Sequence, residues 1–248
     1  MNLLSVVFLL LSFVAAGTQG DSPAMSQWMV FYYKKPLPKN FVTEVRGMSQ
    51  KGQLADLTRA GVIPAFLSQV FAQNPKEIAA WMNALKDLPE PDRYTLYNSL
   101  WLSNTAEGRD YLNKIGLQLP TSAAPDVLKM EFNDPRVVDW LWGYFMATGD
   151  ERSVRRVISA FNLSKYEGAV ERYKSAKNSE QSRQEAYYAI SFEAARESLI
   201  DNCRQHPQVL AVCEKLIKST ELNKTESLWL GVVLSKVAPD RYKIQIGK

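Results

Sequence analysis

Histidine, cysteine and glycine-rich loops are scarce in this chain of 248 residues. Its single histidine, His206, excludes zinc motifs that need two histidines, and any serine or cysteine triad would depend on this one side chain. Neither a Gly-x-Gly-x-x-Gly nor a Gly-x-x-x-x-Gly-Lys segment occurs, which disfavours nucleotide binding in the familiar folds. The sequence therefore predicts no metal, no cofactor and no catalytic motif.

The few thiols and the one imidazole lie close together in the sequence. His206 precedes Pro207 between two predicted helices, so we expect an exposed turn residue there. With Cys203 and Cys213 it would supply only three metal ligands, whereas a structural zinc site needs four. Both cysteines continue apolar helix stripes near this turn, so we expect a disulfide between Cys203 and Cys213 in an oxidising compartment. Two buried free thiols are the alternative.

Alternation typical of β-strands is almost absent, being confined to the tail from Tyr242 and to Met29–Tyr33. Helix signals run nearly from end to end instead. Capping residues followed by proline, or spaced as a capping box, stand at Asn74-Pro75, Asp134-Pro135, Ser164/Glu167 and Asn223/Glu226. Together with apolar periodicity they predict helices over residues 39–50, 60–73, 75–87, 91–103, 106–115, 125–131, 135–147, 151–161, 165–177, 180–204, 207–218 and 224–237.

Short connections predict that consecutive helices fold back on one another as antiparallel hairpins. Leu96–Thr105 and Leu141–Asp150, 45 residues apart, both read as an aromatic helix that ends in a polar turn. Ala147-Thr148-Gly149-Asp150 also resembles the turn between helices of tetratricopeptide-type repeats, although the other signature positions of that family are missing. We therefore predict an all-α fold of stacked helical hairpins, an irregular α-solenoid, with a single globular bundle as the alternative.

The N-terminus indicates export. Leu3 to Ala16 is apolar and uncharged, and small residues follow it up to Asp21, so residues 1–20 are predicted to form a cleaved signal peptide. An uncleaved membrane anchor is the alternative, but 14 residues would cover only about 21 Å of a hydrocarbon core of about 30 Å. No comparable run follows, so we expect a periplasmic or secreted protein without a stable membrane span after signal cleavage.

The exported part divides into three predicted regions: an aromatic and basic arm over 21–39, a helical domain over 40–238 and a tail over 239–248. The arm contains the apolar run Trp28–Tyr33 and the basic, proline-containing run Lys34–Lys39. Its aromatic residues would fix it to the helical core. Alternatively, it would dock on a partner or on an envelope surface.

The net charge of +4 comes from interspersed acids and bases, so no nucleic-acid partner is expected. The largest local excess of positive charge contains Arg152, Arg155 and Arg156, followed by Lys165, Arg172, Lys174 and Lys177, and a solvated helix face is the favoured explanation for it. Trp140 and Trp142 are two residues apart and cannot share one helix face, so at least one should leave the buried stripe. The candidate surface for binding a protein or another envelope component consists of Trp140, Trp142, Arg152, Arg155 and Arg156.

One enzymatic alternative remains. Glu197-Ser198 on a predicted helix resembles the glutamate-serine dipeptide of lytic transglycosylases, in which the glutamate is the general acid. The Gly-Leu-Met-Gln-like stretch of that family is absent downstream. The expected function is therefore a non-catalytic macromolecule-binding or scaffold module, with a peptidoglycan-active enzyme using Glu197 as the alternative. Asn162-Leu163-Ser164 and Asn223-Lys224-Thr225 would accept glycans only in a eukaryotic secretory pathway.

Overall fold

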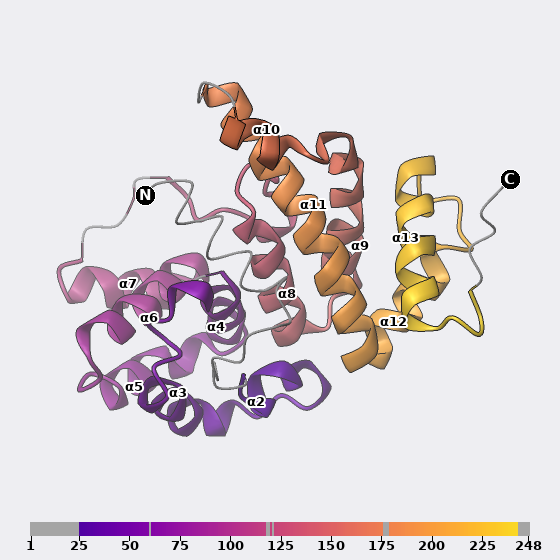
Figure 1. Cartoon of the computed structure of the whole chain (residues 1–248). Coiled ribbons are helices and arrows are strands. Elements are labelled where there is room, and N and C mark those ends of the chain that lie inside the picture. Colours follow the sequence, from indigo (N-terminus) through magenta and orange to yellow (C-terminus); the bar gives the residue numbers. More distant parts are fainter. Residues whose placement is uncertain (1–24, 60, 118–119, 121, 176–178, 243–248) are drawn as a thin grey trace, which may run out of the picture. The chain divides into compact units, whose positions relative to one another are not determined.

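A computed structural model describes residues 25–59, 61–117, 120, 122–175 and 179–242. Helices account for well over half of these residues, and no β-strand occurs among them (Figure 1). The predicted all-α class is confirmed. The expected signal peptide lies outside the described residues, as does the tail beyond Tyr242.

The α-helices and the longest 3-10 helix, η6, occur along the chain in the following order. Their bounds are α2 Gln27–Val30, α3 Phe41–Gln50, α4 Val62–Gln73, α5 Ile78–Ala84, α6 Glu90–Leu102, α7 Ala106–Lys114, α8 Arg136–Thr148, α9 Glu151–Ser159, η6 Ala160–Tyr166, α10 Ala169–Ser175, α11 Glu180–Gln205, α12 Pro207–Leu216 and α13 Lys224–Val237.

Backbone contacts divide the chain into two compact units. Of the described residues, those from Met25 to Met130 and Asp139–Asp150 belong to the N-terminal unit, and those of Glu131–Val138 and from Glu151 to Tyr242 belong to the C-terminal unit. The boundary therefore falls within α8. The predicted division into an arm, one helical domain and a tail stays a prediction.

Aromatic packing fixes the arm within the N-terminal unit. The indole of Trp28 meets the rings of Tyr32 and Phe66 edge to face, with centroids 5.2 Å away in both cases. Its Nε1 donates a hydrogen bond to the carbonyl of Leu37 at 3.3 Å. The expected strand-like run Met29–Tyr33 is wrong, because Ser26 caps a helical turn that begins at Gln27 and buries Met29 and Val30.

Glycine allows close helix packing in the N-terminal unit. A Cβ at Gly143 of α8 would lie 2.2 Å from the carbonyl oxygen of Val62 and 3.0 Å from the backbone nitrogen of Phe66 in α4. No other residue type fits this distance without moving a backbone. Gly143 therefore allows α8 to pack directly on α4.

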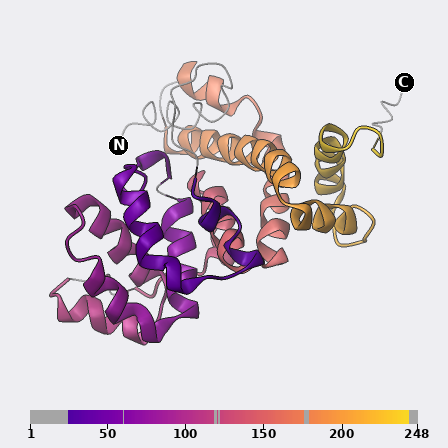
Figure 2. The same ribbon diagram turned by 90° about the horizontal axis from the view of Figure 1, so that it is seen from below.

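The long helix α11 organises the C-terminal unit. Figure 2 shows α12 and α13 at its C-terminal end, and η6 and α13 both contact it. Phe192 of α11 packs against Phe161 of η6 and Trp229 of α13, at centroid distances of 6.4 and 4.8 Å. These apolar contacts join sequence-distant helices into one core.

Most predicted helix starts are close to the observed ones, and two signals are wrong. Ser164 does not cap a helix, because η6 continues to Tyr166 and the chain turns at Gly168, which has a φ of 77°, before α10 begins. The segment predicted as a helix over 125–131 is only a 3-10 turn at Val127–Lys129. The capping box at Asn223 and Glu226 is confirmed.

Candidate functional site

The two tryptophans of the predicted binding surface belong to α8. Trp142 is 3% exposed and meets Phe145 edge to face, with centroids 6.1 Å apart. Trp140 is half-buried. Trp142 is therefore a core residue, and the expectation that it lines a surface is wrong. Trp140 is the residue that leaves the buried stripe.

The three arginines lie on α9. Of the three, Arg152 is exposed, and Arg155 and Arg156 are half-buried. Arg155 reaches α13, and its guanidinium binds both oxygens of Glu226 at 3.0 Å. Arg156 is held over the ring of Phe132 at 4.8 Å and donates from Nη1 to Ser159 Oγ at 2.9 Å. Burial, aided by the positive charge of Arg155, lowers the pKa of Arg156. Arg155 and Arg156 thus make contacts within the C-terminal unit, and the binding role predicted for the three arginines stays a prediction.

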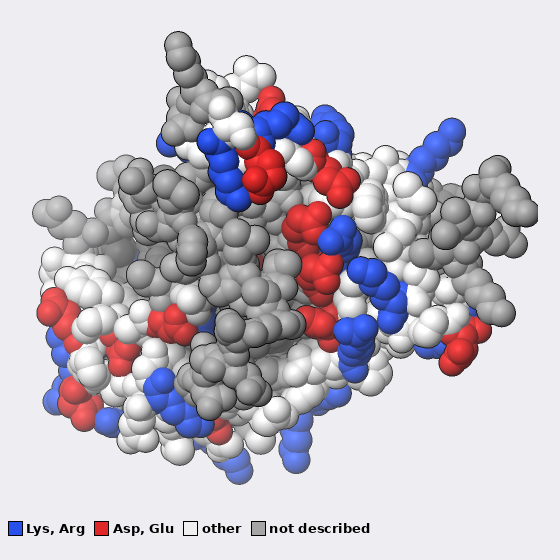
Figure 3. Space-filling model, viewed as in Figure 1, with Lys and Arg blue, Asp and Glu red and all other residues white. Residues whose placement is uncertain are grey.

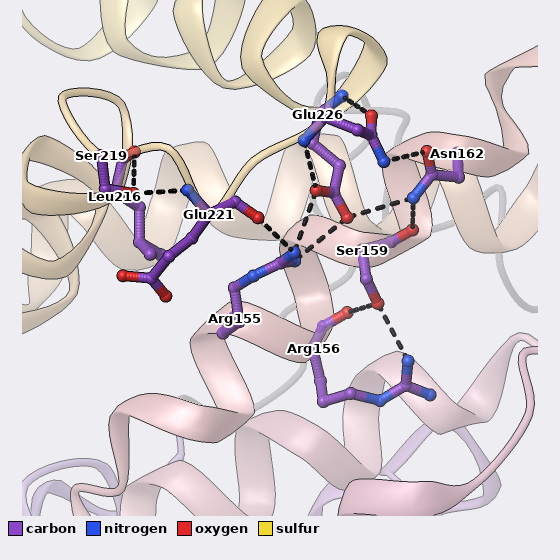
Figure 4. Close-up of polar contacts among 9 residues, drawn as sticks. Arg155, Arg156, Ser159, Asn162, Leu216, Ser219, Glu221 and Glu226 are labelled. Atoms are coloured by element: carbon purple, nitrogen blue, oxygen red, sulfur yellow. Dashed lines mark hydrogen bonds and ion pairs between the residues drawn. The ribbon is translucent and has the colours of Figure 1, made fainter.

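Glu226 is the centre of this polar network, shown in Figure 4. Oε1 accepts hydrogen bonds from Arg155 and from Asn162 Nδ2, the latter at 3.1 Å, while Oε2 accepts from Arg155 and from the backbone N–H of Asn223 at 3.1 Å. The residue is 2% exposed. A buried carboxylate that already accepts four hydrogen bonds has no lone pair left for a substrate, so the network is a structural clamp.

Helix α11 carries the glutamate of the enzymatic alternative. Glu197 Oε1 accepts a hydrogen bond from Arg196 Nε at 3.0 Å, and the Ser198 hydroxyl donates to the carbonyl of Ala194 within the same helix. Figure 3 shows acidic and basic side chains side by side along α11. Glu197 thus belongs to a surface ion-pair cluster. The hydroxyl of the neighbouring Ser198 is hydrogen-bonded to the backbone of its own helix.

Glu193, one turn before Glu197, was not a sequence candidate. Its carboxylate lies 2.6 Å from Arg196. Burial raises its pKa, and the negative charges of Glu167 and Glu197 act in the same direction, so these effects together outweigh the guanidinium. Burial and the approach of Glu167, 26 residues away in sequence, depend on tertiary packing, and sequence spacing does not contain that information.

Cys203 and Cys213 meet across the hairpin of α11 and α12, with their Sγ atoms 3.6 Å apart. Both are buried free thiols in this structure. The expected exposure of His206 is wrong, because this residue is 0% exposed. His206 is both the C-cap of α11 and the N-cap of α12. Its backbone N–H donates a hydrogen bond to the carbonyl of Asn202, and its carbonyl accepts one from the backbone N–H of Val209.

The N-terminal unit also contains an open groove with a volume of about 340 Å³. We call it the Tyr94 groove, after a ring that is 55% exposed although most large apolar side chains are covered. Tyr94 packs edge to face on Tyr97, with centroids 6.2 Å apart, and this contact fixes its orientation. The lining residues are Leu54, Ala55, Asp56, Pro64, Pro91, Tyr94, Thr95 and Asn98.

The polar groups of the Tyr94 groove are mostly occupied. Thr95 Oγ1 donates to the carbonyl of Leu54 at 2.8 Å, and Asp56 accepts from Thr58 and from Arg59 Nε at 3.1 Å. Among the described residues, the exposed amide of Asn98 has no hydrogen-bond partner. The groove therefore combines apolar and aromatic walls with one amide that is available to a ligand.

The sequence places Tyr94 and Asn98 four residues apart on one predicted helix. It does not indicate that a groove forms beside them. That spacing places both on one face of α6. The other wall comes from Leu54–Asp56, an irregular segment whose approach to α6 depends on tertiary packing. Aromatic exposure, which distinguishes Tyr94 from Trp142, could not be read from residue type.

Comparisons of the chain with protein-family models, with curated proteins and with solved structures give no match. Within the described part of the chain, none of the helices combines the length and apolar character that crossing a membrane requires.

Proposed function

We propose that this chain is an exported, non-catalytic binding module that holds an extended peptide segment of a partner protein in the Tyr94 groove. The observation that carries this proposal is an exposed aromatic ring beside the exposed Pro91 and the available amide of Asn98. An amide side chain can donate to a peptide carbonyl and accept from a peptide N–H at once. The ring and the face of Pro91 would pack against the peptide's apolar side chains.

Because the groove is open, a peptide segment is a more suitable ligand for it than a small molecule. Small-molecule sites usually enclose most of their ligand, whereas Tyr94 keeps more than half of its surface in solvent. The acidic group in the lining, Asp56, is already paired with Arg59. This pairing leaves binding, rather than proton transfer, as the chemistry that the groove suits best.

Export, stacking of the helical hairpins and a disulfide belong to the same proposal. The apolar run Leu3–Ala16 supports export. Left-handed turns at Asn104 and Gly149, with φ of 54° and 68°, support the similarity of the segments Leu96–Thr105 and Leu141–Asp150. The proximity of Cys203 and Cys213 supports a bond between them in an oxidising compartment.

Selection from a random heptapeptide display library tests the binding proposal. The wild-type chain should enrich a common peptide motif, and a Tyr94→Ala, Asn98→Ala variant should lose at least about tenfold in affinity for the enriched peptides, since an aromatic anchor and a hydrogen bond are removed together. Ile115→Ala is the matched control, because Ile115 is another exposed apolar side chain, at 41%, that does not line the groove.

Equal affinity of wild type and groove variant for the selected peptides would contradict the proposal, provided that both chains have the same helical circular dichroism. The alternative, a peptidoglycan-active enzyme using Glu197, is not favoured by any contact of that residue. Solubilisation of peptidoglycan by wild type but not by Glu197→Gln would replace the binding proposal with that enzyme.

A further inference from the structure

The arm and α3 form one of the basic regions of the chain. Residues 25–53 hold five basic side chains and one acidic side chain, so their excess of four equals the net charge of the whole chain. The other residues hold as many acids as bases. The arm and α3 are therefore a basic region, and residues 152–177, with seven basic and two acidic side chains, are another.

Two of these six charges are already engaged by the fold. The Arg46 guanidinium lies 2.7 Å from Asp87, and Glu44 accepts a hydrogen bond from the Ser26 hydroxyl at 2.7 Å. Lys34, Lys35 and Lys39 are exposed, and the described residues place no carboxylate within 4.0 Å of them. We call residues 31–39, which carry these three lysines, the basic arm.

Apolar side chains accompany the lysines of the basic arm. The Lys34 ammonium lies 4.6 Å from the centre of the Phe31 ring and 5.9 Å from that of Tyr33. Phe31, Tyr33 and Leu37 are all half-buried. Long lysine stems beside aromatic rings are typical of surfaces that meet the headgroup region of a bilayer.

The arm is held in place rather than free to collapse. Trp28 packs beneath it and donates to the Leu37 carbonyl, Tyr32 is 1% exposed, and Pro36 and Pro38 restrict the backbone between the lysines. Its lysines are therefore presented on a fixed surface, which reduces the entropy lost on binding.

We propose that the basic arm binds the anionic headgroup surface of a lipid bilayer. Lysines are attracted to the negative surface potential, and the neighbouring rings and Leu37 provide apolar contact at the interface. A nucleic acid or another soluble polyanion would use the charge alone and would leave these apolar side chains without a role. This binding is peripheral and independent of whether the Tyr94 groove holds a peptide.

Co-sedimentation of the full chain with phosphatidylcholine vesicles, with and without about 30% phosphatidylglycerol, tests this inference. The apolar N-terminal run is present in both measurements, so the difference between the two vesicle types isolates the charge-dependent part. Binding should be at least about tenfold stronger to the anionic vesicles at low salt and should weaken strongly at about 0.5 M salt.

The triple variant Lys34→Glu, Lys35→Glu, Lys39→Glu should lose this tenfold preference. The matched control Lys76→Glu, Lys114→Glu, Lys218→Glu makes the same change in net charge at exposed lysines elsewhere and should bind within about twofold of wild type. Unchanged helical circular dichroism shows that each variant is folded.

Three results would overturn the proposal. Equal binding to neutral and anionic vesicles would remove the role of charge. Equal losses in the two triple variants would show that net charge, and not the arm, is responsible. Binding to heparin or short DNA without binding to anionic vesicles would assign the arm to a soluble polyanion.

Discussion

Asn223 donates a hydrogen bond from its side-chain amide to the side-chain oxygen of Asn162 at 2.9 Å. These are the asparagines of the two glycosylation sequons, so both potential acceptors meet inside one network (Figure 4). Asn162 Nδ2 also donates to the Ser159 carbonyl and to Glu226 Oε1, at 3.0 and 3.1 Å. An N-linked glycan would replace one of the two amide hydrogens that these contacts use.

The first prediction follows from this contact. When the chain is secreted from a glycosylating eukaryotic cell, molecules that carry a glycan on Asn162 should be less stable than unmodified ones by about 1–3 kcal/mol, because buried Glu226 loses a donor. The control is Ser164→Ala, Thr225→Ala, which abolishes both sequons and keeps both asparagines. Equal melting temperatures for glycosylated wild type and this control would contradict the prediction that the hydrogen bond from Asn162 to Glu226 stabilises the fold.

The second prediction concerns the Arg155–Glu226 pair. Arg155→Ala should destabilise the chain by about 3 kcal/mol, the low end for breaking a buried pair, because Glu226 is buried whereas Arg155 is 32% exposed. Lys215→Ala is the control, since Lys215 also connects to α9, through Glu151, but in a pair exposed by 69% and 52%. It should cost at most about 1 kcal/mol in denaturant unfolding. Similar losses for both variants would show that burial does not govern the pair.

Local signals in the sequence predicted the helices well because their causes are local. The capping box at Asn223 and Glu226 satisfies backbone donors within one turn, so α13 begins and ends where expected. The turns at Asn104 and Gly149 were predicted to be equivalent, and both have positive φ. Ser164 had the same local signal but failed, because η6 extends through it and packs against α11.

The candidate site was not predictable in the same way. Trp140 and Trp142 were correctly assigned to different faces, but residue type did not show which of them is buried. The bidentate pairing of Arg155 spans 71 residues of sequence, and nothing near Arg155 indicates Glu226 as its partner. Burial and long-range pairing are properties of the assembled helices, so a surface chosen from charge and aromatic content alone included structural residues.

The third prediction compares two helical glycines. Gly143→Ala should destabilise by about 2 kcal/mol or more, because its Cβ would collide with the α4 backbone at Val62. Gly231→Ala in α13 should stabilise by about 0.5–1 kcal/mol, since its Cβ meets nothing within 4 Å and alanine favours the helix. Thermal unfolding of both variants checks this. Stabilisation by Gly143→Ala would refute the close approach of α8 and α4.

The fourth prediction is a pH dependence caused by Glu193, whose pKa is raised by burial and by neighbouring carboxylates. Above the ordinary glutamate pKa of about 4.3, and up to the raised native value, the folded chain binds more protons at this site than the unfolded chain. Its contribution to the free energy of unfolding therefore falls as pH rises through this window.

Glu193→Gln does not titrate, so the stability of wild type relative to this variant should decrease as pH rises from about 4.3. Urea unfolding at several pH values measures the difference in stability between wild type and variant. Carboxylates with lowered pKa, such as Asp134, titrate in both chains, so their contributions cancel from this difference. A difference that is constant over pH would contradict the raised pKa. A difference that grows with pH would show that the ion pair with Arg196 dominates instead.

The last prediction concerns when the disulfide forms. The contact with Cys203, followed by burial, raises the pKa of the Cys213 thiol well above its usual range, so Cys213 offers little thiolate for exchange in the folded chain, where both cysteines are buried. Oxidation should therefore take place while the chain is still unfolded. Two protein thiols and one disulfide of an oxidising reagent then give the Cys203–Cys213 bond and two reagent thiols.

Thiol counting on unfolded, unreduced protein checks this order of events. Chains folded in a reducing compartment should show two thiols and should keep them when oxidised glutathione is added to the native protein. Chains folded in an oxidising compartment should show none and should be more stable, at the lower end of about 2–4 kcal/mol because the closed loop is short. Two thiols in natively exported chains would show that the pair stays reduced, and rapid oxidation of the native reduced protein would show that burial does not protect it.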